Sequence, residues 1–236
     1  MNAIENAQVA DLVRASRILF RHGVVDAFGH VSARPANGSP GFLMSRSMAP
    51  ALVGSDDILL LDEAGEAASG ETRSLFLERF IHAAIYRVRP DVVAVVHSHS
   101  PAVIPYGIVD GVPLAPVFHM AAFIEDGPPV FEIRDHAGPD SDMLIRDAAL
   151  GEALAKVLGE GAAVLMRGHG STVVGGSIAE AVFRAVHLET NARIHTDALR
   201  HGPVRTLSPG EARAAAAANA GQIHRAWDLW SREVET

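Results

Sequence analysis

The sequence contains no cysteine. Disulfide bonds and thiolate metal ligands are therefore excluded, and any bound metal would rest on histidine, carboxylate and water. Basic residues are also in the minority: 20 Lys and Arg stand against 28 Asp and Glu, for a formal net charge of −8 at pH 7. This excess of negative charge argues against nucleic acid or an anionic membrane surface as a partner.

Long uninterrupted apolar runs are missing as well, and none reaches the length needed to cross a membrane. The first residues, Met1 to Gln8, lack the basic start and the apolar core of a signal peptide. We therefore expect a cytoplasmic protein. No linker divides the 236 residues, so we expect a single domain over residues 1–236.

Twelve histidines stand out in the composition, and two of them follow the most apolar stretch of the chain. Residues 92–96 read Val-Val-Ala-Val-Val, which predicts a strand covered on both faces of a layered α/β domain. His97 and His99 come next, and because strand side chains alternate between faces, both should project to the same side. They form half of a metal site or, equally, two histidines hydrogen-bonded at a strand end. Ser100 and Pro101 then suit the start of a helix.

A further imidazole comes from Arg167-Gly168-His169-Gly170, where the glycines let the backbone approach a ligand and expose His169 at a strand end. Together, His97, His99 and His169 would supply three neutral imidazoles, the usual protein complement of a catalytic metal site with open positions. Glu78, on a helix predicted for residues 75–89, is the natural carboxylate, either as a fourth ligand or as an acid/base.

Hydrophobic periodicity and turn residues predict the other elements. Helices are expected at residues 9–22, 75–89, 102–106, 147–158, 177–200 and 212–233, and strands at 28–34, 42–45, 57–62, 92–96, 130–133, 163–166 and 171–174. The C-terminal helix, in about residues 208–233, carries Trp227, Leu229 and Trp230, more aromatic surface than a terminal helix normally exposes. We expect it to pack on a neighbouring subunit or to close over the site, within a homo-oligomer.

The order of these motifs resembles the class II aldolase/adducin family over about residues 9–198. The resemblance rests on Glu78-x-x-x-His82-x-x-x-Tyr86, Pro90-Asp91, His97-x-His99-Ser100, Arg167-Gly168-His169-Gly170 and Ala179-Glu180-Ala181. It implies a three-layer α/β/α sandwich around a mixed, largely antiparallel sheet, instead of the parallel sheet that residues 92–96 alone favour. It also implies a tetramer with sites at subunit boundaries.

The resemblance also assigns roles to the candidate site residues. In the family's enzymes, the residues matching His97, His99 and His169 bind one divalent metal ion, for which Mn, Zn, Fe and Co are all candidates here. The residue matching Glu78 is the catalytic acid/base or an extra ligand.

Two motifs depart from the family's sugar-phosphate aldolases. Gly29-His30-Val31-Ser32 has His30 where these aldolases typically have the asparagine of a phosphate-binding Gly-Asn-x-Ser motif. The next loop begins Ser45-Arg46-Ser47, and Arg46 presents a planar donor suited to a carboxylate. We expect His30, Ser45, Arg46 and Ser47 to bind substrate, and His30 and His119 to be catalytic candidates beside Glu78. A structural or surface role for His30, Arg46 or His119 is the alternative.

The amino-acid sequences of these two motifs resemble those of the family's aromatic decarboxylases. These enzymes include 3-hydroxy-2-methylpyridine-4,5-dicarboxylate 4-decarboxylase and the dihydroxyphthalate decarboxylases. Aldol cleavage and decarboxylation both break a carbon–carbon bond and leave electrons that an oxygen on a metal can absorb. The sequence therefore predicts a metal-dependent decarboxylase of a hydroxylated aromatic or pyridine (di)carboxylate. The alternatives are a sugar-phosphate aldolase or epimerase, an iron-dependent oxygenase and a non-catalytic adducin-like scaffold, which should have lost the metal ligands.

Overall fold

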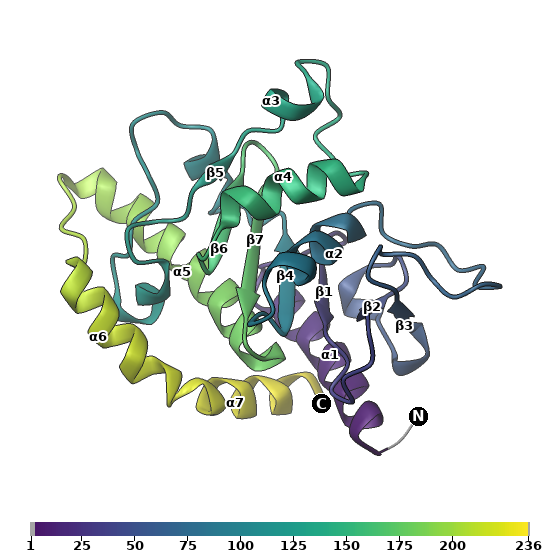
Figure 1. The fold of residues 1–236 in the computed structure, drawn as a ribbon. Coiled ribbons are helices and arrows are strands. Elements are labelled where there is room, and N and C mark those ends of the chain that lie inside the picture. Colours follow the sequence, from purple (N-terminus) through teal and green to yellow (C-terminus); the bar gives the residue numbers. More distant parts are fainter. Residues whose placement is uncertain (1–2, 236) are drawn as a thin grey trace.

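A mixed seven-stranded sheet forms the centre of the molecule in the computed structural model, which describes residues 3–235 (Figure 1). Five of the six neighbouring pairs are antiparallel and one is parallel. The spatial order of the strands is β3 (Ile58–Leu61), β2 (Phe42–Ser45), β1 (His30–Ala33), β4 (Ala94–Ser98), β7 (Gly170–Gly175), β6 (Ala163–Met166) and β5 (Val130–Phe131). The mixed, largely antiparallel sheet is therefore confirmed.

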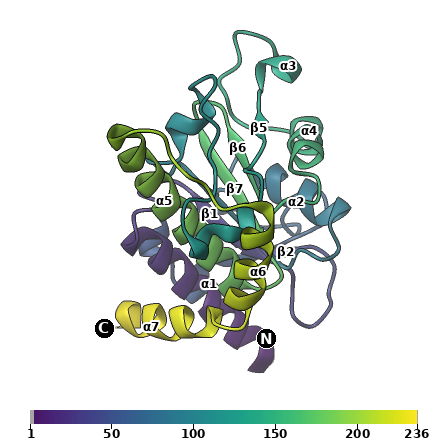
Figure 2. The same cartoon turned by 90° about the vertical axis from the view of Figure 1, so that its left-hand side faces the viewer.

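Strand β4 lies in the middle of this sheet, and helices bury its side chains on both faces. Ala94 and Val96 belong to the core that also contains side chains of α1 (Ala3–Arg21) and α5 (Ile178–His201). Val95 points the other way, into the core shared with α2 (Arg79–Val88) and α4 (Ala148–Leu158). Figure 2 shows α1 and α5 on one side of the sheet and α2 and α4 on the other. The predicted three-layer α/β/α arrangement is confirmed.

Helix α2 begins later than the sequence predicts, at Arg79 instead of residue 75. The segment before it is held by other contacts: the carbonyl of Ser74 accepts the backbone N–H of Ser47 at 2.7 Å. The carbonyl of Phe76 accepts Nη1 of Arg79 at 3.2 Å. Glu78 therefore occupies the position just before the first helical residue instead of lying within the helix.

No α-helix follows β4 at residues 102–106, in contrast to the prediction. The chain instead forms a short 3-10 helix, η3 (Ile104–Gly107). Pro105 lacks the backbone N–H that an α-helical turn would use, which limits the element to this short form. The other short helices in the described chain are η1 (Pro50–Leu52), η2 (Ser55–Asp57), η4 (His119–Ile124) and α3 (Arg134–Ala137).

The C-terminal segment forms two helices, α6 (Pro209–Ala220) and α7 (Ile223–Glu235), where the sequence predicts one. The break falls at Gly221, a poor helix former. Helix α7 packs on α1 of its own chain, where Glu235 pairs with Arg14 at 2.7 Å. Its Trp230 is buried, whereas Leu229 remains 56% exposed. Contact with a neighbouring subunit stays a prediction.

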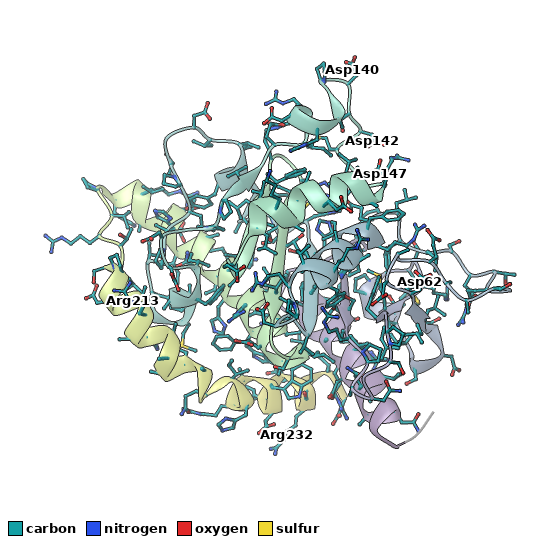
Figure 3. All side chains as sticks on the ribbon, in the orientation of Figure 1. Asp62, Asp140, Asp142, Asp147, Arg213 and Arg232 are labelled. Carbon is teal, nitrogen blue, oxygen red and sulfur yellow. The ribbon has the colours of Figure 1, made fainter. Side chains whose placement is uncertain are left out.

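Several charged side chains lie on the outside of this architecture, whereas Glu78 and Glu189 are buried. Figure 3 shows Asp140, Arg213 and Arg232 at the outer surface. Within residues 3–235, no helix is both long and apolar enough to span a bilayer.

Candidate metal centre and adjoining cavity

Strand β4 brings the first two histidines together, as its alternating side chains predict. His97 is the fourth residue of β4 and is fully buried; His99 follows immediately after the strand. Their Nε2 atoms lie 3.3 Å apart. The backbone beyond His99 is fixed from α5, because the carboxylate of Glu189 accepts the hydroxyl of Ser100 and the backbone N–H of Ala102.

The turn between β6 and β7 adds His169. This turn requires glycine at two places: Gly168 has φ +63°, and a Cβ on Gly170 would meet the carbonyl oxygen of Ser98 at 1.9 Å. Because β7 pairs with β4, the turn reaches the end of β4, and Nε2 of His169 lies 2.9 Å from Nε2 of His99. The glycine-flanked histidine therefore occupies the place that the sequence predicts for it.

Glu78 closes the group from the start of α2. Its Oε2 lies 3.3 Å from Nε2 of His97 and 3.4 Å from Nε2 of His169. One ligand atom from each of Glu78, His97, His99 and His169 lies within 4.8 Å of all the others. Three imidazole nitrogens and one carboxylate oxygen, with no thiolate, form a donor set suited to Zn, Mn, Fe or Co. The residues fit one divalent metal ion.

One loop segment, which the sequence did not single out, orients two members of this group. The carbonyl of Met143 accepts Nδ1–H of His169 at 2.8 Å, which leaves Nε2 free for a metal. The backbone N–H of Ile145 donates to Oε1 of Glu78 at 3.1 Å, which turns Oε2 toward the histidines. Met143 has φ +69°, a conformation that non-glycine residues rarely adopt. Such strain is found where surrounding structure and function require it.

The pKa values in the group reflect burial and mutual contact. Burial by itself would raise the pKa of Glu78, but the neighbouring His97 and His169 outweigh it and hold the pKa well below its ordinary value. Burial, together with the neighbouring His97, lowers the pKa of His99 to about 4. For His169, the Glu78 carboxylate outweighs burial and raises the pKa above 6.5.

The directions of these pKa shifts predict how metal occupancy depends on pH. A metal ion binds only neutral imidazole, and His169 has its pKa raised, so protons compete for it from about neutral pH downward. We expect metal content to be complete near pH 8 and to fall steadily toward pH 5. Dialysis against metal-free buffers across this range, followed by elemental analysis, measures the effect. Occupancy that stays constant down to pH 5 would contradict it.

A cavity of about 390 Å³ opens beside the metal group. His97, His99 and Glu78 form its polar wall together with His30 and Ser47. The rest of the lining is apolar, with Ala27, Phe28, Gly29, Met48, Ala49, Phe76, Leu77 and Leu144. None of the described residues that line it is an arginine or a lysine. The cavity can therefore hold an apolar ring against the metal group, but its described lining offers no arginine or lysine for a phosphate.

The substrate and proton-transfer residues expected from the sequence are only partly brought together here. His30 and Ser47 line the cavity, whereas Ser45 is buried in β2. Arg46 donates from Nε to the carboxylate of Asp57 at 2.7 Å and lies outside the lining. His119 is exposed on η4 and also lies outside it. No described residue of α6 or α7 lines the cavity, so in the single chain the C-terminal helices do not close over the site.

A larger cavity, of about 690 Å³, lies at the opposite end of β4 and β7. Its two arginines are already paired: Arg89 binds Asp91 at 2.7 Å and Arg184 binds Glu180 at 2.7 Å. It lacks a group of metal-ligating side chains, since the only such group in residues 3–235 is the one at Glu78. The smaller cavity is therefore the candidate active site.

A model of the class II aldolase and adducin N-terminal domain matches residues 10–196. The chain belongs to this family. Among curated proteins it is similar to the decarboxylase tropJ of Talaromyces stipitatus, with 37% identity over 100% of this chain and 97% of that protein. It is also similar to a 3,4-dihydroxyphthalate decarboxylase of Arthrobacter keyseri, with 31% identity over 75% of this chain and 73% of that protein.

Solved structures share the fold. An L-fuculose 1-phosphate aldolase from Glaciozyma antarctica PI12 superimposes with a TM-score of 0.78 at 24% identity, covering 98% of this chain and 89% of that one. An aldolase II superfamily protein from Pseudomonas syringae superimposes with a TM-score of 0.80 at 22% identity, covering 100% of this chain and 94% of that one. These solved structures show the fold alone, while the two curated relatives described above are decarboxylases, which supports an enzyme of the lyase class.

Proposed function

We propose that this protein is a divalent-metal-dependent decarboxylase of a hydroxylated aromatic or pyridine (di)carboxylate. The observation that carries the proposal is the pairing of a metal-ligating group with a cavity whose other walls are apolar and whose described lining lacks arginine and lysine. A hydroxylated ring with a carboxylate beside the hydroxyl suits such a site. Its ring would contact Phe28, Phe76 and Leu77, and its polar edge would face the metal group.

The chemistry divides between the metal and the chain. When bound, the divalent ion supplies a Lewis acid that accommodates the negative charge developing as carbon dioxide leaves. The chain excludes water with its apolar walls and provides a proton for the ring carbon that loses the carboxylate. Glu78 is the proposed acid/base or a fourth ligand, since it lines the cavity beside the histidines. Its pKa lies well below the ordinary value, so as an acid/base it is a carboxylate that first takes up the proton of the substrate's ring hydroxyl and then passes a proton to the ring carbon. His30 is the next candidate, and His119 lies outside the cavity of its own chain.

A panel of substrates tests this function. The metal-loaded protein is offered a ring-hydroxylated monocarboxylate, a ring-hydroxylated dicarboxylate and a ketose 1-phosphate, and carbon dioxide, aldehyde and oxygen uptake are followed. We expect carbon dioxide from at least one aromatic acid, without oxygen uptake. Aldehyde from the sugar phosphate alone would restore the aldolase alternative, and oxygen consumption would favour an iron-dependent oxygenase. Release of carbon dioxide by the protein would contradict a non-catalytic scaffold.

Phe28 offers a test of ring binding at the cavity mouth. Its side chain is 64% exposed, and its ring is stacked near that of His99 with the centroids 6.2 Å apart. Aromatic contacts of this kind are worth about 0.5–1.5 kcal/mol, so Phe28→Ala should raise KM for an aromatic acid by roughly three- to tenfold with metal content unchanged. Leu52→Ala, also exposed but outside the cavity, is the matched control. Equal KM values in both variants would count against ring stacking at Phe28.

We also propose that the protein is a homo-oligomer, with a tetramer expected from its family. Phe20 on α1 and Leu229 on α7 are 48% and 56% exposed, and the two helices pack against each other. Exposed apolar side chains on adjoining helices are typical of an interface. Light scattering at micromolar concentration should give a multiple of the 25.0 kDa chain mass. A mass equal to one chain would contradict the proposal.

A further inference from the structure

A three-residue segment in the connection between α3 and α4 contacts both the metal group and the cavity. The carbonyl of Met143 accepts Nδ1–H of His169 at 2.8 Å. The backbone N–H of Ile145 donates to Oε1 of Glu78 at 3.1 Å. Leu144, between them, lines the cavity. The path of this backbone therefore sets the orientation of two members of the metal group.

The peptide unit between Met143 and Leu144 is bound at both of its ends. Its carbonyl, from Met143, accepts from His169. Its N–H, from Leu144, donates to Oδ1 of Asp142 at 3.1 Å, in the same connection between α3 and α4 (Figure 3). The C=O and N–H of a trans peptide unit lie in one plane and point in opposite directions, so holding one end fixes the direction of the other. Asp142 therefore sets where the carbonyl behind His169 points.

The direction of both hydrogen bonds is fixed by the groups that make them. A carbonyl oxygen and a carboxylate oxygen only accept, and a backbone N–H only donates. The N–H of Leu144 and the ion pair with Arg146 hold the pKa of Asp142 below its ordinary value, so this side chain is a carboxylate. Hydrogen bonds in a chain polarise one another, so the charge of Asp142 also strengthens the carbonyl as an acceptor for His169.

Met143 is the position that needs this support. Its φ of +69° lies in the left-handed region, which non-glycine residues rarely adopt. Oγ of Ser141 accepts the backbone N–H of Met143 at 3.0 Å, so the peptide units on both sides of Met143 are each held by a side chain two residues earlier. Without these contacts the backbone would relax toward a commoner φ, and the carbonyl would turn away from His169.

We propose that Asp142 is a positioning residue, whose carboxylate acts through the peptide unit between Met143 and Leu144 to hold His169 with Nε2 directed at the metal site. This inference rests on the metal site of the proposed function and not on the identity of the substrate. Metal-ligating histidines commonly donate their other N–H to a carboxylate or a carbonyl. Here the carbonyl is the direct partner and the carboxylate stands behind it. Asp142 is itself neither in the metal group nor in the cavity lining.

Cobalt(II) titration of the metal-stripped protein reads this positioning without any substrate. The titration gives the metal affinity, and the visible absorption of bound cobalt depends on the number and geometry of its ligands. Asp142→Ala removes the acceptor of the Leu144 N–H. Loss of a direct partner of a ligand costs about 10- to 100-fold in metal affinity, and because Asp142 acts through a peptide unit we expect about a three- to thirtyfold loss. The cobalt spectrum should change as well.

Three further variants separate positioning from charge and from loop stability. Asp142→Asn keeps an oxygen for the Leu144 N–H but loses the charge, and should bind cobalt within about threefold of the wild type. Arg146→Gln removes only the ion pair with Asp142 and should also match the wild type. Asp62→Ala is the matched control, because Oδ1 of Asp62 accepts the backbone N–H of Ala64 at 2.9 Å in the same kind of turn, outside the metal group and the cavity lining. It should leave cobalt affinity and spectrum unchanged.

Wild-type cobalt affinity and spectrum in folded Asp142→Ala would overturn the inference, and so would equal losses in Asp142→Ala and Asp142→Asn. If Asp142→Ala does not fold, Asp142→Glu takes its place: it keeps the charge but displaces the carboxylate from the Leu144 N–H, so the same loss is expected and wild-type binding would overturn the inference.

The proposed function can fail separately. If the wild-type protein binds cobalt but decarboxylates no aromatic acid, the proposed function fails, and the cobalt titrations still decide the role of Asp142. A wild-type protein that binds no cobalt would contradict the metal site and the inference together.

Discussion

Replacing His169 with alanine should release the metal and reduce activity by about a thousandfold or more. The change removes one of three imidazoles from the group and leaves two imidazoles with the Glu78 carboxylate. A Lewis acid typically contributes several kcal/mol to the rate-limiting step, and about 4 kcal/mol corresponds to a factor of a thousand. His169 lies in a turn and not in the fully buried strand that holds His97, so the variant should keep the fold.

Elemental analysis after dialysis measures the metal, and circular dichroism checks the fold. His119→Ala is the matched control, because His119 is an exposed histidine that lies outside the metal group. It should retain a full complement of metal. A His169→Ala variant that also retains it would show that this histidine is not a ligand.

Replacing Glu78 with glutamine should leave the protein folded and lower turnover by about a hundred- to ten-thousandfold. The amide keeps an acceptor for the backbone N–H of Ile145, so the side chain stays in place. It can neither donate a proton as a carboxylic acid does nor bind a metal as strongly as a carboxylate. Single-turnover kinetics and metal content are measured together.

Metal content then separates the two roles of Glu78. Retained metal with lost turnover identifies a proton donor, and loss of both identifies a ligand. Glu152→Gln, on the exposed face of α4 where Glu152 pairs with Arg87, is the control and should behave as the wild type. More than a tenth of wild-type turnover in Glu78→Gln would contradict both roles.

The metal group was predictable from the sequence because its signals are local. The two-residue spacing of His97 and His99 on a strand fixes their common side, and the glycines around His169 mark a turn that approaches another backbone. The contacts that orient the group were not predictable. Met143 and Ile145 act through backbone atoms, which every residue type has, so the sequence does not mark these positions.

Tertiary contacts also explain the other differences between the sequence predictions and the structure. The apolar residues of β4 indicate only that both faces of the strand are buried. An antiparallel strand between two helical layers is buried on both faces as well as a parallel one is. The sequence predicts that Arg46 contacts substrate, but in the structure its guanidinium donates to the carboxylate of Asp57, eleven residues along the chain. The four-residue spacing of His82 and Tyr86 in the family motif does not show that both are buried, which is possible because His30 and Ser32 on the facing strand supply their hydrogen-bond partners.

Carbon dioxide release as a function of bound metal tests the central claim most directly. The protein is stripped with a chelator and titrated with manganese or zinc in the presence of a ring-hydroxylated aromatic acid labelled with carbon-13 in the carboxylate. We predict no labelled carbon dioxide from the stripped protein and a rate that rises in proportion to metal up to one equivalent per chain, where it levels off. Labelled carbon dioxide at an undiminished rate without metal would contradict the account.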